Sequence, residues 1–209
     1  MGFSFGGHIV EHRAPVKAPR TLRALYEEYP ELDDEPQPDP DASLDFLELA
    51  YDGKVHRTDE MVGLEVASSR EGDRPYVTFD QRCVVVFDRW GALSCDFEQE
   101  EPPSTFEARL AAYTLRRDIQ RLMVFTLDSV SDSYGFIVFE GGKRVRRFSF
   151  IPAPEEPIRI DEGARLATEP EEEAHPHDRI DQAAKSLLGR RLIELAGDES
   201  LRAFVCDKR

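Results

Sequence analysis

The alternation of apolar and polar positions predicts three successive β-strands in the middle of the chain. Residues 122–129 and 134–140 are apolar on both faces, which is typical of strands buried inside a sheet. Gly141 and Gly142 precede a third strand at 143–150, and a glycine pair supplies the positive φ angles of a two-residue hairpin turn. The segment therefore predicts an antiparallel meander.

Residues 44–51 fit two periods, because alternate residues are apolar as in a strand, while a short helix could also begin there. The following Asp52-Gly53 pair is a hairpin turn signal and favours the strand. Further short strands are predicted at 64–66, 76–79, 83–87 and 92–97. Sequential strands with short connections favour antiparallel pairing.

Two segments have a helical stripe. Ser104 and Glu107 have the spacing of a capping box, and the apolar stripe that follows reaches Arg121. The second stripe covers 179–196, with Asp178 as the expected N-cap and Gly197 as the stop. We therefore expect a single α+β domain over residues 1–209: a largely antiparallel sheet of about six to eight strands with two main helices packed on it.

Two acidic, proline-rich segments interrupt this pattern. Residues 27–48 contain ten acidic side chains and no basic one, with four prolines among them. Carboxylate repulsion and proline both oppose packing into regular structure. We expect exposed loops near 27–43 and 152–178.

The densest basic cluster is Lys143, Arg144, Arg146 and Arg147, within the third strand of the meander. Apolar residues change face along this strand, so a one-residue β-bulge near Arg146 is expected. The cluster fits either a charged edge strand that discourages aggregation or an anion site, and we favour the edge strand.

The net charge of -15 disfavours nucleic acid and membrane surfaces, since both bind through Lys and Arg. It favours a basic protein partner, although acidity also serves solubility alone. The N-terminus has no segment of the signal-peptide kind, and three cysteines are an odd number, so a cytoplasmic location is expected. Cys83 and Cys95 could pair across a hairpin, but two buried, reduced thiols are favoured.

His8, Glu11 and His12 match H-x-x-E-H, the pattern in which two histidines one helical turn apart bind zinc beside a glutamate. The neighbouring glycines and proline leave little room for such a helix. His175 and His177, beside three glutamates, offer a second set of metal donors, and a joint site of both pairs would bring the two ends of the chain together. Strand or loop histidines are the simpler interpretation.

No catalytic signature is present: the chain has no G-x-S-x-G, no G-x-x-x-x-G-K and no G-x-G-x-x-G sequence. Asp128 and Asp132 fit a Ser/Asp-rich turn better than a catalytic pair. Trp90, at an expected turn tip, is a candidate interface anchor. The candidate acidic contacts are Asp33, Asp34 and Glu35.

Residues 134–147, together with Asp161-Glu162-Gly163, resemble a hairpin of uncharacterised bacterial α+β domains. The resemblance covers under a fifth of the chain. It implies a bacterial cytoplasmic protein and no catalytic residue.

These observations favour a non-enzymatic intracellular interaction protein, such as an inhibitor or immunity protein for a basic partner, with no cofactor. The alternative is a small metal-dependent hydrolase that uses an H-x-x-E-H zinc site.

Overall fold

The computed structural model describes residues 4–14, 46, 48, 55–63, 75–80, 82–87, 97, 105–128, 131–170, 174–196 and 202–208. Several predictions lie outside these residues and keep their status: the acidic loop near 27–43 with Asp33, Asp34 and Glu35, the strand at 64–66, Trp90, and Cys95. The strand predicted at 44–51 is wrong where the structure describes it, because Phe46 and Glu48 are helical, as the competing period of that segment allowed.

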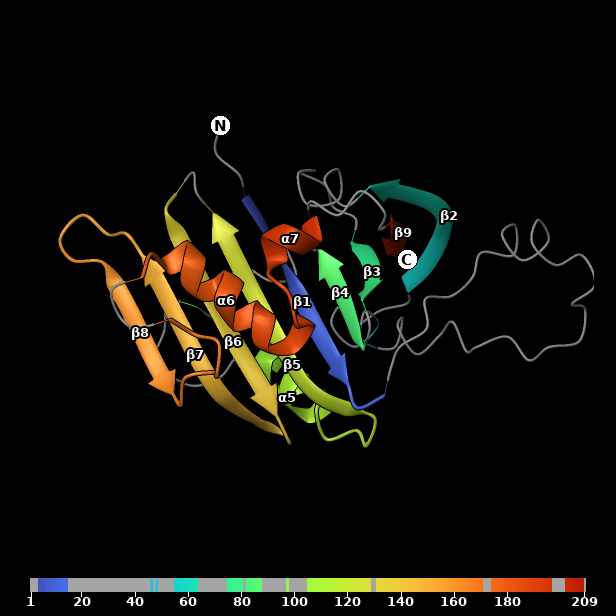
Figure 1. The fold of residues 1–209 in the computed structure, drawn as a ribbon, viewed down its shortest axis with the longest axis horizontal. Coiled ribbons are helices and arrows are strands. Elements are labelled where there is room, and N and C mark those ends of the chain that lie inside the picture. The colour runs from blue at the N-terminus through green and yellow to red at the C-terminus, as the bar shows by residue number, and fades with distance from the viewer. Residues whose placement is uncertain are drawn as a thin grey trace, which may run out of the picture.

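One antiparallel sheet forms the centre of the described structure (Figure 1). Its strand order is β2-β9-β3-β4-β1-β5-β6-β7-β8. The strands are β1 (Ser4–His12), β2 (Val55–Gly63), β3 (Tyr76–Asp80), β4 (Cys83–Phe87), β5 (Ile119–Asp128), β6 (Ser133–Glu140), β7 (Lys143–Ile151), β8 (Ile158–Gly163) and β9 (Arg202–Lys208). The expected α+β fold is confirmed, and the sheet has nine strands in the described part of the chain.

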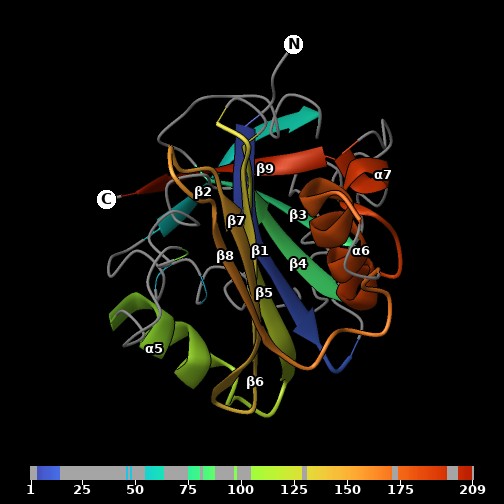
Figure 2. The same cartoon turned by 90° about the vertical axis from the view of Figure 1, so that its left-hand side faces the viewer.

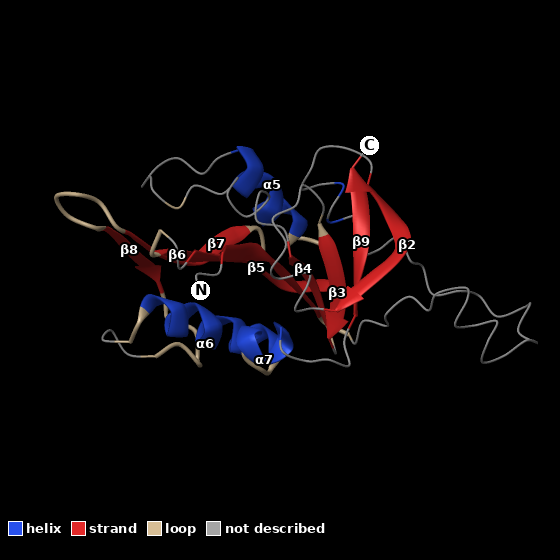
Figure 3. Cartoon of the chain, turned by 90° about the horizontal axis from the view of Figure 1, so that it is seen from above, coloured by secondary structure: helices blue, strands red, loops and turns tan. Residues whose placement is uncertain are grey.

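The described helices lie on both faces of the sheet: α5 (Thr105–Tyr113), α6 (Pro176–Leu188) and α7 (Leu192–Ala196). Figures 2 and 3 show α6 and α7 on one face and α5 on the other. Each face has its own buried apolar cluster, because neighbouring residues of a strand point to opposite sides. Among the described helices, none has the length and apolar character needed to span a bilayer.

The predicted meander is present as β5, β6 and β7. Gly141 and Gly142 have φ angles of 55° and 81°, as the two-residue turn requires. The predicted bulge is also confirmed: Val138 pairs with Arg146 and Phe139 with Arg144, so one residue of β7 is unmatched.

Both helix predictions need correction: the first extends too far, and the second joins two helices into one. The first helix ends at Tyr113, where the Thr114 hydroxyl donates to the Ala111 carbonyl, and strand β5 begins at Ile119. The stripe at 179–196 forms two helices, because Gly189 adopts φ 78° and ends α6. His175, not Asp178, is the N-cap of α6.

Two further predictions need correction. The expected loop 152–178 contains strand β8, which lies at the margin of the sheet. Its charged residues concealed the strand in the sequence pattern. The basic cluster does not belong to an edge strand, since β7 lies between β6 and β8. Arg146 and Arg147 are each 1% exposed, which indicates a structural use of their charges that the sequence did not reveal.

Candidate functional site

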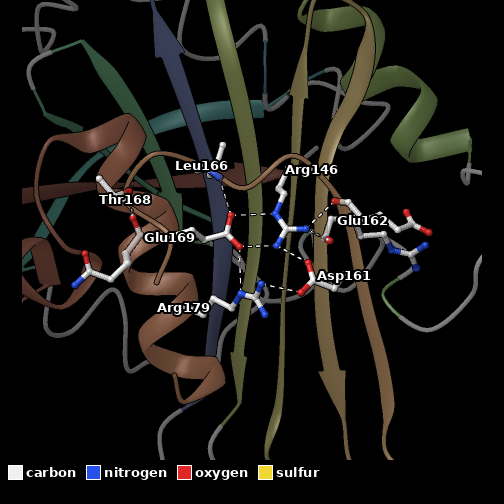
Figure 4. Close-up of polar contacts among 9 residues, drawn as sticks. Arg146, Asp161, Glu162, Leu166, Thr168, Glu169 and Arg179 are labelled. Atoms are coloured by element: carbon white, nitrogen blue, oxygen red, sulfur yellow. Dashed lines mark hydrogen bonds and ion pairs between the residues drawn. The ribbon is translucent and has the colours of Figure 1, made fainter. Parts of the chain in front are cut away.

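A largely buried ring of two arginines and two carboxylates joins the sheet to α6, and we call it the arginine cluster. It consists of Arg146 of β7, Asp161 of β8, Glu169 of the following loop and Arg179 of α6. Figure 4 shows that the positive and negative groups alternate around the ring.

The side chain of Glu169, like that of Arg146, is 0% exposed. Its Oε1 accepts from Arg146 Nη2 at 2.5 Å and from Arg179 Nε at 3.1 Å. Its Oε2 accepts from Arg146 Nε and from the Leu166 backbone N–H, both at 2.9 Å. One carboxylate therefore fastens the loop after β8 to both the sheet and α6.

Arg146 has a partner for each of its guanidinium nitrogens. Nη1 donates to the backbone carbonyls of Arg147 at 3.0 Å and Glu162 at 2.7 Å, and Nη2 also pairs with Asp161 Oδ1 at 2.6 Å. A buried arginine is tolerated when its five N–H groups are satisfied in this way. Arg146 is therefore a structural residue.

Arg179 is bound less completely. Its Nη2 donates to Asp161 Oδ2 at 2.7 Å, and its guanidinium carbon lies 4.3 Å from the centre of the Phe148 ring. Its buried Nη1 has no hydrogen-bond partner in the described structure. The aromatic face of Phe148 compensates part of that deficit through a cation–π contact.

Two members of the cluster, Asp161 and Arg146, stay ionised at neutral pH. Burial alone would raise the pKa of Asp161, but the hydrogen bonds from Arg146 and Arg179 lower it below its usual value. Burial would lower the pKa of Arg146, yet Glu169 and Asp161 raise it. Asp161 therefore carries no proton to donate near pH 7, so the cluster does not resemble an acid–base pair.

Beside the cluster lies an open groove of about 1000 Å³ on the α6 face of the sheet. Its floor and walls come from β6, β7, β8 and the start of α6. The lining residues are Asp132, Tyr134, Phe148, Phe150, Pro152, Arg159, Asp161, Ala174, His175 and Pro176. Aromatic side chains with a few polar groups are typical of a binding surface.

The polar rim of the groove is held by local contacts. Asp132 adopts φ 52° in the turn before β6, and its Oδ1 accepts from the Tyr134 hydroxyl at 3.3 Å. Burial and this carboxylate raise the pKa of Tyr134, so the phenol stays protonated. His175 caps α6 by accepting from the His177 N–H at 3.2 Å, and its ring lies edge-on to Tyr134 at 5.6 Å.

The H-x-x-E-H residues lie on strand β1, not on a helix. His8 is 0% exposed and lies 5.1 Å from the Phe46 ring and 6.3 Å from the Phe106 ring, between centroids. Burial lowers the pKa of His8 to about 3. Glu11 points to the opposite face, where it pairs with Arg82 at 2.7 Å and Arg121 at 2.6 Å.

The other candidate metal ligands, His12, His175 and His177, do not lie beside His8. His12 Nδ1 lies 3.9 Å from Asp118 Oδ2, and burial lowers the pKa of His12. His175 and His177 lie at the start of α6, on the opposite face from His8. Within the described ranges, no group of three or more His, Cys, Asp or Glu side chains is placed to hold a metal ion.

Cys83 and Cys206 are buried, and Cys83 Sγ donates to the Leu187 carbonyl at 3.3 Å. Sequence reasoning missed Asp161, Glu169 and Arg179. Arg179 begins the apolar stripe of α6, which was a weak signal for a buried charge. Glu169 gave no signal, because it lies among many acidic loop residues.

Comparison with known proteins gives one relationship. Residues 27–205 match a family described as "Family of unknown function (DUF6928)". No curated protein matches the chain. No solved structure matches it either.

Proposed function

We propose that this chain, which belongs to the DUF6928 family of unknown function, is a non-enzymatic interaction protein that binds a basic protein partner through its groove. The observation that carries the proposal is the groove itself, with aromatic residues along its floor and Asp132 at its rim. Aromatic anchors and charge complementarity are the usual means by which an interface gains affinity and speed.

The arginine cluster supports this proposal because it fixes one wall of the groove. Asp161 and Phe148 line the groove and also contact Arg179. The cluster contains two positive and two negative groups, so it leaves the excess of negative charge on the rest of the chain unchanged. A rigid wall lowers the entropy lost on binding.

An inhibitor or immunity protein in the cytoplasm of a bacterium is the role that fits these features best. Cys83 and Cys206 are both buried, as small apolar residues are, which supports a reducing compartment. Zinc analysis tests the alternative hydrolase: stoichiometric zinc that disappears in an H8A/H12A variant would favour it over the interaction proposal.

The direct test is titration with an acetylated, amidated peptide of alternating lysine and phenylalanine, with a glutamate–phenylalanine peptide as the charge control. We expect binding of the basic peptide only, weakened about threefold to fivefold by Asp132→Asn. Asparagine keeps the left-handed turn at this position. The matched control is Glu140→Gln, which removes an exposed carboxylate at the other end of β6. Equal binding of both peptides, or equal weakening by both variants, would contradict the proposal.

A further inference from the structure

Strand β8 forms one margin of the described sheet: it pairs with β7 on one side and is last in the strand order (Figure 1). At an open margin, alternate residues direct their backbone N–H and C=O groups outward, where another strand can bind them. Charged residues on such a strand usually discourage pairing. In β8 the order of the charged residues instead permits pairing with a second copy of the strand.

The register with β7 shows which face each β8 residue occupies. Asp161 pairs with Phe148 and Arg159 with Phe150, so both charged side chains lie on the α6 face, beside the groove. Ile160 pairs with Ser149, and Ile158 pairs with Ile151, on the other face. Ile158 is 37% exposed, which is unusual for a large apolar residue.

A second copy could pair with this margin through a two-fold axis normal to the sheet. Such an axis keeps each residue on its own face, so it must pass through a residue position. An axis at Arg159 sets the two copies of Arg159 opposite each other, and an axis at Asp161 does the same for aspartate. Only an axis at Ile160, among these three, sets Arg159 opposite Asp161 of the other copy.

The Ile160 register is favourable on the α6 face. On the α6 face, Arg159 and Asp161 form two symmetry-related pairs of opposite charge, and Asp161 has lone pairs left beyond those used by Arg146 and Arg179. On the other face, Ile160, which is already 6% exposed in the single chain, lies opposite its own copy, and Ile158 lies opposite Glu162.

We propose that two copies of this chain associate through antiparallel pairing of β8 with β8, centred on Ile160. The partner copy then contributes its own Arg159 and Asp161 to the rim of each groove, so that the two grooves meet across the axis. A pairing of six-residue strands is a small interface, so a weak dimer with micromolar affinity is expected. The inference does not depend on what the groove binds.

Sedimentation velocity over a concentration series up to about 500 µM measures the association. We expect a dimer whose dissociation constant rises at least about tenfold in Arg159→Glu, because like charges then oppose each other in two places. Arg165→Glu is the matched control: it changes the net charge equally from an exposed position outside β8. It tests whether the net charge of -15 alone governs the association.

Cysteine crosslinking tests the register. Ile160→Cys places a thiol next to its own copy, at a Cα separation that a disulfide can bridge, whereas Ile158→Cys lies opposite Glu162. With copper phenanthroline as the oxidant and the unsubstituted chain as the baseline, we expect a covalent dimer of Ile160→Cys only.

Three results would overturn the proposal: a monomer at every concentration, equal association of Arg159→Glu and the unsubstituted chain, or equal crosslinking at positions 158 and 160. Equal weakening by Arg165→Glu would likewise replace the specific pairing with a net-charge effect. A monomer that still binds the basic peptide would refute the dimer and leave the proposed function standing.

Discussion

Arg146 and Glu169 are joined side by side, with Nη2 donating to Oε1 at 2.5 Å and Nε donating to Oε2 at 2.9 Å. Both side chains are 0% exposed. A two-point contact between planar groups fixes their orientation as well as their separation. The loop after β8 is thereby held against the sheet beside the groove.

Breaking this contact from one side should be costly. Arg146→Met leaves the Glu169 carboxylate buried with half of its partners, and we expect a loss of about 3 to 5 kcal/mol in the free energy of unfolding. Arg116→Met is the control, since its pair with Asp118 is partly exposed and should contribute under about 1 kcal/mol. Urea unfolding measures both. Adding Glu169→Gln to Arg146→Met should recover part of the loss, and a further loss would contradict the account.

Asp161 should give the protein a stability that disappears in acid. Its folded pKa is lowered, so the stabilisation is complete above its unfolded pKa of about 4 and is lost as the pH falls through the folded value. We expect Asp161→Asn to cost about 2 kcal/mol at pH 7 and to flatten the acid limb of the stability profile. The exposed Asp178→Asn should stay within about 0.5 kcal/mol.

The titration of His8 should change the stability of the protein over a different pH range. Its folded pKa of about 3 lies below the unfolded value of about 6.5, so the unfolded chain binds more protons between these values. Stability should therefore fall as the pH decreases below 6.5, by about 1.4 kcal/mol per pH unit at most.

His8→Leu tests this expectation, because it removes both the titration and two buried ring nitrogens that have no partner in the described part of the chain. We expect the slope between pH 6.5 and 4 to become shallower, leaving the contribution of His12, whose pKa burial also lowers, and the stability at pH 7 to rise by about 1 to 3 kcal/mol. His175→Asn is the control, since the imidazole there is exposed and asparagine can still cap α6. A slope unchanged by His8→Leu would show that another group governs this range.

Gly163 ends β8 at a close approach between strands. It has φ 83°, and a Cβ there would lie 2.1 Å from the Val145 carbonyl oxygen. Gly189 has φ 78°, but nothing lies within 4 Å of a Cβ. Gly189→Ala should therefore cost about 1 kcal/mol from backbone strain alone, whereas Gly163→Ala should cost clearly more. Equal melting temperatures of the two variants would contradict this close contact.

The sequence predicted those parts of the fold that depend on local signals. The Gly141-Gly142 turn and the bulge beside Arg146 are confirmed, because turn chemistry and side-chain alternation act over a few residues. The arginine cluster was not predictable in this way. Arg146 and Glu169 are 23 residues apart, and only the sheet and α6 bring their charges together.

In the H-x-x-E-H pattern, by contrast, the sequence suggested a site whose residues the fold separates. Its spacing suits a helix, where His8 and His12 would share a face with Glu11 beside them. In strand β1 the same spacing sends His8 into one apolar layer and Glu11 towards Arg82 and Arg121 on the other side. A short motif specifies a site only when its secondary structure is known.

The central claim is that the groove beside the arginine cluster binds a basic partner. Amide chemical-shift mapping of the full chain with the lysine–phenylalanine peptide tests it most directly. The account predicts saturable shifts grouped around the groove, at Asp132, Tyr134, Phe150, Arg159 and His175. Shifts that are absent, or that gather away from these residues, would contradict it.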